Sequence, residues 1–270
     1  MGYKIFALCV RQLMSNWQMA VRLSWFWSLA FGLPYIGSLG FILAVSDGPN
    51  PPQPLTVAWA GMMILLLLAM VFGVAAYCII AIGWHRFILR EEVPDRFYVL
   101  RPEWSPVRYF RNSMTICILI GLITMPIMAV ALLFLLSQLT PPVAALNLAP
   151  IALGVMWTIM FVVGSLNTWI ALRVGMILPA SALNETMTIP ESYRLTGPLA
   201  GQLLVTSVCI VSLLIVPLIM GHSLQTFASH ASVVMLLVAP VFLVWCWITF
   251  FVGFGILTVV YGHLAENRPI

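Results

Sequence analysis

The side chains best suited to bind a ligand gather between residues 84 and 111, in an otherwise nearly uncharged sequence. This stretch holds six of the twelve Lys and Arg residues, and a second polar stretch at 173–198 adds two arginines. Guanidinium groups match phosphate and carboxylate geometry, and cations at a membrane surface attract anionic headgroups. The pattern predicts a site for an anionic lipid headgroup or a protein partner, formed by His85, Arg86, Arg90, Arg108, Arg111, Arg173 and Arg194. The alternative is that these cations only anchor the chain in the membrane, with Arg–Glu pairs neutralising one another.

Other reactive patterns are missing from the sequence. It contains no His-Glu-x-x-His pair, no Gly-x-Ser-x-Gly elbow and no phosphate-binding glycine loop. His222 and His230 have no Cys or carboxylate near them, which makes them a poor metal site. The five cysteines are widely spaced and fall in or near apolar runs, so we interpret them as small apolar residues. We therefore expect no catalytic residue, no cofactor and no metal.

The composition indicates what must position these arginines. Hydrophobic residues make up 62% of the 270 residues and charged residues 7%, whereas a soluble domain carries about 25% charged residues. The net charge of +4 is small and forms no basic stripe, so we expect no nucleic-acid partner. Six uncharged runs are long enough to cross a hydrocarbon core of about 30 Å as helices; they are 23–46, 57–83, 113–136, 150–172, 199–220 and 233–261. We predict an all-α integral membrane protein with six transmembrane helices in a single transmembrane domain, residues 1–270.

The distribution of charge predicts the topology. With six crossings, all twelve Lys and Arg residues fall on one side of the membrane, and the loops on the other side have none. The positive-inside rule then places both termini and the two long polar loops in the cytoplasm, with the protein in a bacterial inner membrane. The six runs carry no Asp, Glu, Lys or Arg at mid-depth, which weighs against a transporter coupled to protons or sodium ions.

The N-terminal segment, residues 3–22, has an amphipathic pattern. Lys4, Arg11, Ser15 and Arg22 share one face of a helix, and apolar residues fill much of the remainder. A basic face beside an apolar face is typical of a helix that lies in the membrane interface. The alternative is that this segment only extends the first spanning helix.

The spans show a threefold regularity. Pro34, Pro126 and Pro217 lie at matching depth in the odd-numbered spans, 92 and 91 residues apart. Helix-starting signals precede two of these spans: Ser105-Pro106, and the capping-box spacing from Thr188 to Glu191. Either the chain contains three copies of an interfacial helix plus a transmembrane hairpin, at 3–90, 99–175 and 188–263, or common membrane prolines align by chance.

Two stretches resemble a known group of proteins. After the second span the chain reads Trp84-His85-Arg86 and then Glu92-Val93-Pro94, and the second polar loop contains Leu178-Pro179-Ala180 and 191–196. These stretches resemble uncharacterised six-span inner-membrane proteins of Alphaproteobacteria. The chain is also loosely similar to the membrane domain joined to some bacterial glycerophosphodiester phosphodiesterases. The resemblance implies the six-span layout and brings no established activity, and we expect no phosphodiesterase catalysis because no soluble domain accompanies these residues.

These observations favour a non-enzymatic membrane protein. We predict an accessory, scaffold or assembly subunit that contacts membrane lipids and another membrane protein through its helix faces and basic loops. The alternative is a transporter or lipid-handling protein for an apolar or lipid substrate, and an intramembrane enzyme comes third. A polar cavity lined by Asn167, Thr168 or Gln202 would favour transport, whereas a packed interior would argue against it.

Overall fold

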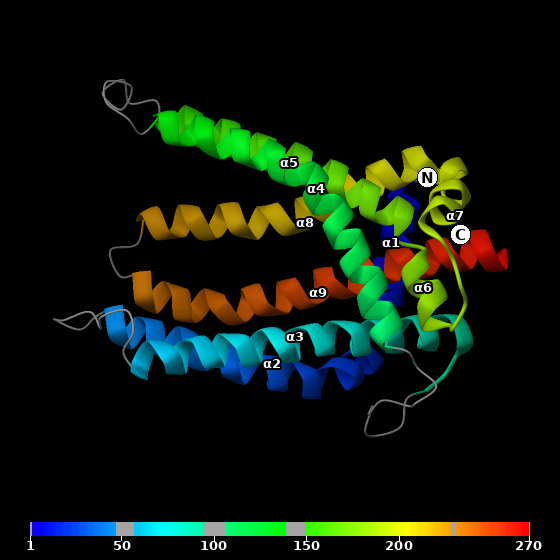
Figure 1. Ribbon diagram of the computed structural model, residues 1–270, viewed down its shortest axis with the longest axis horizontal. Helices are drawn as coiled ribbons and strands as arrows, with labels where there is room; N and C mark the ends of the chain where they lie inside the picture. Colours follow the sequence, from blue (N-terminus) through cyan, green and yellow to red (C-terminus); the bar gives the residue numbers. More distant parts are fainter. Residues whose placement is uncertain (1, 47–56, 94–105, 139–148, 228–230, 270) are drawn as a thin grey trace.

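The computed structural model describes residues 2–46, 57–93, 106–138, 149–227 and 231–269, and within these ranges the chain forms helices and no strand (Figure 1). The long helices are α2 (Trp17–Ser46), α3 (Val57–Arg90), α4 (Pro106–Gln138), α5 (Ala149–Val174), α8 (Ala200–Phe227) and α9 (Ala231–Glu266). The short elements are α1 (Gly2–Ser15), α6 (Ile177–Ala182), α7 (Ile189–Leu195) and the 3₁₀ turn η2 (Gly197–Leu199). The prediction of an all-α fold is confirmed.

Five of the long helices have the length and composition of membrane spans. Their apolar stretches are Trp59–Arg90, Pro106–Val130, Gly154–Val174, Gly197–Ile215 and Leu243–Glu266. The sixth expected span, 23–46, falls within α2, which has 30 residues and would reach about 45 Å at 1.5 Å per residue. Most side chains after Pro34 in α2 lie outside the described residues, so the count of six spans stays a prediction.

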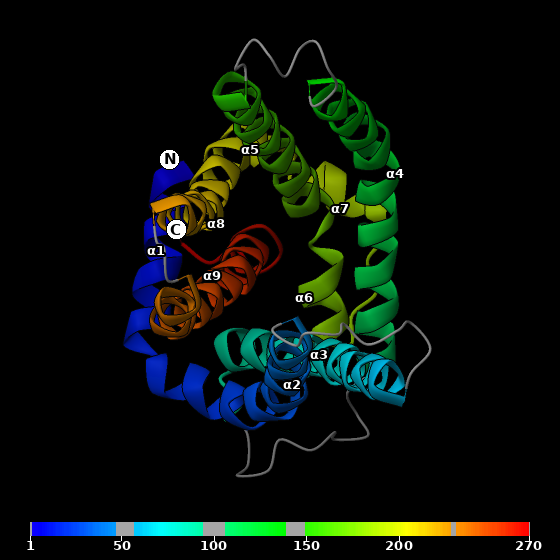
Figure 2. The same cartoon turned by 90° about the vertical axis from the view of Figure 1, so that its left-hand side faces the viewer.

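The long helices form three antiparallel hairpins arranged in a ring (Figure 2). The hairpins are α2–α3, α4–α5 and α8–α9, and they meet through α3 with α4, α5 with α8, and α3 with α9. Both termini lie at one end of this ring, together with α1, α6 and α7 (Figure 1). We call this end the basic end: α1, α6 and α7 with residues 17–27, 76–93, 106–117, 166–207 and 249–269. The remaining parts of the six long helices are the distal halves of the hairpins.

Helix α1 lies across the basic end and not along the spans (Figures 1 and 2). A turn at Asn16 separates it from α2, so it is not an extension of the first spanning helix. Its buried stripe of Gly2, Ile5, Cys9 and Leu13 faces α8 and α9. The apolar face that was expected to enter the membrane interface is therefore largely used for packing within the protein.

The starts of two helices match their sequence signals. Helix α4 begins at Pro106, as the proline predicts. Helix α7 has the expected capping box, in which the Thr188 hydroxyl accepts from the backbone of Glu191 and the Glu191 carboxylate accepts from the backbone of Thr188. Pro34 and Pro126 lie inside α2 and α4, and Pro217 falls within the bounds of α8. The threefold repeat itself stays a prediction.

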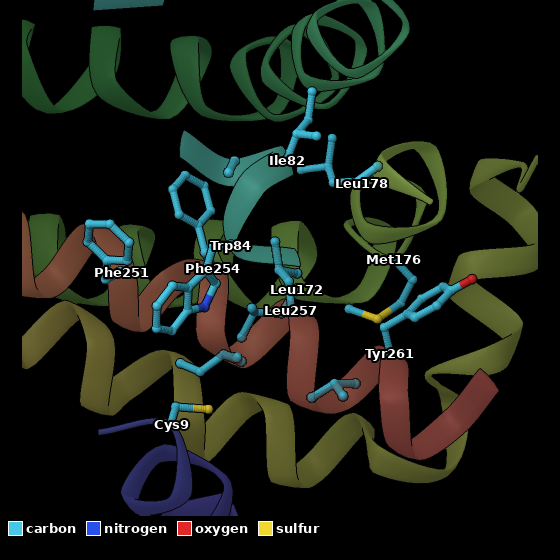
Figure 3. Close-up of a cluster of buried hydrophobic side chains, with 14 of the residues drawn as sticks. Cys9, Ile82, Trp84, Leu172, Met176, Leu178, Phe251, Phe254, Leu257 and Tyr261 are labelled. Carbon is cyan, nitrogen blue, oxygen red and sulfur yellow. The ribbon is translucent and has the colours of Figure 1, made fainter. Parts of the chain in front are cut away.

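A cluster of buried hydrophobic side chains lies at the basic end (Figure 3). Trp84 of α3 is fully buried and packs edge-on against Phe251 of α9, with ring centroids 5.1 Å apart. The cluster also takes side chains from α1, α5 and α6, among them Cys9, Leu172 and Leu178. Burial raises the pKa of the Cys9 thiol far above its usual range, which agrees with its prediction as a small apolar residue.

Candidate binding site at the basic end

His85 lies inside the bundle, where it joins three helices. Its ring is fully buried, with Nδ1 2.7 Å from Oγ1 of Thr258 on α9 and Nε2 3.2 Å from the hydroxyl of Tyr109 on α4. The Thr258 hydroxyl donates to the carbonyl oxygen of Phe254, so it accepts from Nδ1–H. Nε2 then accepts from the Tyr109 hydroxyl. Because both ring nitrogens are engaged within the protein, His85 does not present the headgroup contact expected at the surface.

Arg86 holds the end of α3 to α6. Its guanidinium bonds both carboxylate oxygens of Glu92, at 2.8 and 3.1 Å, and donates to the carbonyl oxygen of Ala182 at 3.0 Å. Glu91 has φ 55 and ends α3 in the left-handed region, so Glu92 follows directly after the turn. The Arg86 side chain is 12% exposed and the Glu92 side chain 37%, so Arg86 forms a partly buried, bidentate ion pair within the protein.

Arg90 belongs to a more exposed cluster at the same end. It pairs with Glu185 at 3.1 Å, and the second carboxylate oxygen of Glu185 accepts from the hydroxyl of Tyr261 on α9. Arg268 of the C-terminal tail donates to the carbonyl oxygens of Ile88 and Leu89 at the end of α3. Cations near helix C-termini are favoured because those carbonyl oxygens lack partners in the helix. These contacts connect α9 and the tail to α3.

Arg173 is buried between aromatic rings. Its guanidinium carbon lies 3.6 Å from the ring centroid of Tyr193 and 5.5 Å from that of Trp169. Nη2 donates to the carbonyl oxygen of Tyr193 at 2.8 Å, and Nε donates to the hydroxyl of Thr196 at 3.4 Å. The π faces and the carbonyl end of α7 stabilise the charge without a carboxylate. Arg173 therefore fastens α5 to α7.

Helix α7, which supplies Tyr193 to this contact, is stabilised at its own start by the capping box. The backbone N–H of Thr188 bonds a carboxylate oxygen of Glu191 at 2.7 Å. This bond, with a smaller contribution from the Thr188 hydroxyl, holds the pKa of Glu191 below its usual range.

The remaining predicted residues lie nearer the surface. Arg111 on α4 and Arg194 on α7 are exposed, and neither forms an ion pair with another described residue. Arg108 on α4 is half-buried and interacts with the rest of the protein. The structure thus divides the seven predicted residues. His85, Arg86, Arg90 and Arg173 hold the basic end together, whereas Arg111 and Arg194 remain accessible.

Several polar side chains of the described spans pair inside the protein. The Thr124 hydroxyl lies 2.9 Å from Oδ1 of Asn167, linking α4 to α5. The indole N–H of Trp169 donates to the carbonyl oxygen of Ala200 at 2.8 Å. The Thr206 hydroxyl lies 3.0 Å from the carbonyl oxygen of Gly2, and a Cβ at Gly2 would come within 2.3 Å of the Gln202 carbonyl oxygen, so α1 needs glycine there.

Sequence reasoning missed the partners of the basic residues. Tyr109 and Thr258 at His85, and Tyr193 and Trp169 at Arg173, were not among the predicted residues. No local pattern indicates these partners, because Tyr109 lies 24 residues from His85 and Tyr193 lies 20 residues from Arg173. Within the described ranges, no group of three or more His, Cys, Asp or Glu side chains is placed to hold a metal ion.

In comparisons with known proteins, no family model, no curated protein and no solved structure matches the chain. The fold and composition define the class: an all-helical integral membrane protein whose apolar helices are consistent with several passes through the bilayer. The resemblance to the alphaproteobacterial six-span proteins stays a prediction.

Proposed function

We propose that this protein is a non-enzymatic subunit of a bacterial inner-membrane complex, acting as an accessory, scaffold or assembly factor. It crosses the membrane six times, and the basic end, with both termini, faces the cytoplasm. It binds a partner membrane protein through the exposed apolar face in the distal half of α4. The proposal is carried by the wide apolar surface of α4, and the positive-inside pattern supports its orientation.

Helix α4 leaves many apolar side chains of its distal half exposed. It contacts α5 as its hairpin partner, and it meets α3 and α6, of which α6 lies at the basic end. Leu122 is 72% exposed and Met125 is 71% exposed, and the exposed side chains from 122 to 133 cover about 200° of the helix at 100° per residue. Helices associate in lipid through close packing of such faces. A partner span can dock on these exposed side chains of α4.

The internal pairing of the polar span residues supports a scaffold over a transporter. A transport path for a polar headgroup needs side chains that can bind the moving group. Asn167 instead bonds Thr124, and the indole of Trp169 bonds the backbone of Ala200. Such hydrogen bonds between and within helices stabilise a packed membrane bundle.

The ring of hairpins supports the threefold repeat. Helix α1 precedes the first hairpin and packs on α8 and α9 of the third, and α7 precedes the third hairpin and packs on α5 of the second. Each of these short helices therefore packs on the hairpin that comes before its own hairpin in the order around the ring, with the third hairpin counted as coming before the first. Within this arrangement, Arg111 and Arg194 are the arginines that contact anionic headgroups.

The test is extraction of the tagged protein from its native membrane in polymer nanodiscs, followed by mass spectrometry of everything retained. We expect a stoichiometric membrane protein that is lost from a Leu122→Trp, Val130→Trp variant, because the added rings block close packing on α4. The matched control is Met63→Trp, Met70→Trp on the exposed face of α3, which should retain the partner. Retention of lipid alone by the unchanged protein would overturn the scaffold proposal and favour lipid handling.

A further inference from the structure

The outward face of α1 remains open after the helix has packed on α8 and α9. The exposed residues of α1 are Tyr3, Lys4, Arg11, Met14 and Ser15, and they lie opposite the buried stripe that contains Ile5 and Cys9. This outward face is not part of the docking face on α4, nor of the predicted arginine site.

The outward face is divided along its length. At 100° per residue, Lys4, Arg11 and Ser15 fall within about 40° of one another. Tyr3 and Met14 fall within about 20° of each other, and the two groups lie about 90° apart around the helix. One flank is therefore cationic and the other apolar, separate from the buried stripe of Gly2, Ile5, Cys9 and Leu13 that packs on α8 and α9.

Charge on this part of the chain has a single sign. Residues 1–46 contain Lys4, Arg11 and Arg22 and no Asp or Glu. All three cations are exposed, and no ion pair between described residues involves them. Trp17 and Trp25 follow at the start of α2 and are exposed as well, as tryptophans at a membrane interface commonly are.

The orientation of α1 brings this face to the depth of the headgroups. The helix crosses the ends of the long helices instead of following them (Figures 1 and 2). In a bilayer that surrounds the spans, such a helix lies in the plane of the interface. The cationic flank then contacts the phosphates of the surrounding lipids, and the apolar flank contacts the acyl chains of the same lipids.

We propose that the outward face of α1 binds anionic phospholipid. Lys4 and Arg11 contact the phosphate-containing headgroups, and Tyr3 and Met14 enter the upper acyl region. This inference rests on the membrane orientation given under the proposed function and does not depend on a protein partner. It also gives the N-terminal helix two surfaces, one for α8 and α9 and one for lipid.

The experiment uses the full chain in vesicles of equal parts phosphatidylglycerol and phosphatidylcholine. A Tyr3→p-benzoylphenylalanine variant is irradiated, and its lipid adducts are identified by mass spectrometry. We expect the ratio of phosphatidylglycerol to phosphatidylcholine among the adducts to exceed the bulk ratio about fivefold or more, since each cation near an anionic surface contributes about 1 kcal/mol, which is about fivefold in this ratio. Adding Lys4→Gln, Arg11→Gln should return the adducts to the bulk ratio.

Two controls separate this result from general exposure to lipid. The same photoreactive side chain at Leu122, an exposed position on α4, should capture both lipids at the bulk ratio. Lys4→Arg, Arg11→Lys should keep the enrichment at Tyr3, because the charge is conserved. Adducts at Tyr3 in the bulk ratio, adducts to protein instead of lipid, or enrichment unchanged by Lys4→Gln, Arg11→Gln would each overturn the proposal.

Discussion

The basic end and the distal halves of the hairpins contain similar apolar residues but differ in how deeply those residues are buried. At the basic end, Trp84 is fully buried and His85 has two partners on other helices. In the distal half of α4, Leu122 is 72% exposed and Met125 is 71% exposed. Each long helix passes through both environments. At the basic end, side chains pack against other parts of the protein. In the distal halves, exposed apolar side chains are available to contact lipid or another protein.

The difference follows from what lipid can and cannot supply. Between helices surrounded by acyl chains there is little hydrophobic driving force, so close packing and hydrogen bonds decide which contacts form. The basic end has buried aromatic rings, a bidentate Arg86–Glu92 pair and the His85 contacts. We infer that the basic end determines the arrangement of the three hairpins and that the distal halves follow from it.

The largest expected difference between the two regions concerns large-to-small substitution. Trp84→Ala should lower the free energy of unfolding by about 3–5 kcal/mol, because it opens a cavity in the cluster of Figure 3. Leu122→Ala should change it by less than about 0.5 kcal/mol, because lipid replaces the lost contacts. Unfolding in mixed micelles with increasing denaturing detergent measures both. Similar losses for the two variants would refute the contrast.

The buried hydrogen bonds at His85 provide a second comparison. Thr258→Val keeps the side-chain shape but removes the acceptor for Nδ1–H, and it should cost about 1–3 kcal/mol of unfolding free energy. Thr158→Val is the matched control, since that hydroxyl bonds only the carbonyl oxygen of Gly154 in its own exposed turn. Its effect should be within about 0.5 kcal/mol in the same assay. If the two valine variants were equally stable, His85 would not hold α3 to α9.

The aromatic stack around Arg173 should show a smaller effect. Arg173→Lys retains the charge but loses the planar stacking on Tyr193 and one of two hydrogen bonds, so we expect a loss of about 1–2 kcal/mol. Arg194→Lys, an exposed change with the same chemistry, should have almost no effect. Unfolding in mixed micelles distinguishes them, and equal stability of both variants would mean that the stack does not fasten α5 to α7.

The smallest expected effect is a pH dependence confined to α7. The pKa of Glu191 is lowered in the folded protein, so the carboxylate stabilises the start of α7 above its unfolded pKa, and this stabilisation disappears as the pH falls through the folded pKa. Hydrogen-exchange protection of the α7 amides should therefore fall between neutral and acidic pH. Glu191→Gln keeps the capping acceptor without a titrating group, so its protection should not vary with pH in this way.

Part of the fold follows from local sequence patterns. The start of α4 at Pro106 and the capping box of Thr188 and Glu191 were both predicted, because these signals act within one helical turn. The amphipathic pattern predicted a separate helix at 3–22, and the structure has a separate α1 that ends at Ser15, whereas 17–22 belong to α2. The sequence did not predict that the apolar face of α1 packs on α8 and α9, because an apolar stripe can pack equally well on lipid and on other helices.

The candidate site itself stays a prediction, but the structure shows contacts of its residues that the sequence did not indicate. The sequence predicted one group of six arginines and His85 because these residues lie near the same ends of the spans. In the structure, Arg86 and Arg90 pair with carboxylates, and Arg173 stacks on aromatic rings. Arg111 and Arg194 remain exposed. Charge and spacing do not reveal a partner that lies far away in the chain.

Composition and the length of the hydrophobic runs determined by themselves that this chain is helical and suited to lipid. In a bilayer the backbone can form all of its hydrogen bonds only in helices or in a closed barrel, and the uncharged runs of this chain have the length of membrane-spanning helices. Only the tertiary structure decided which side chains meet. His85 and Thr258 are 173 residues apart, and nothing in the local pattern of either one specifies the other. Their contact exists because the packing of three hairpins at the basic end leaves two buried polar groups within hydrogen-bonding distance, where an unpaired group would be costly.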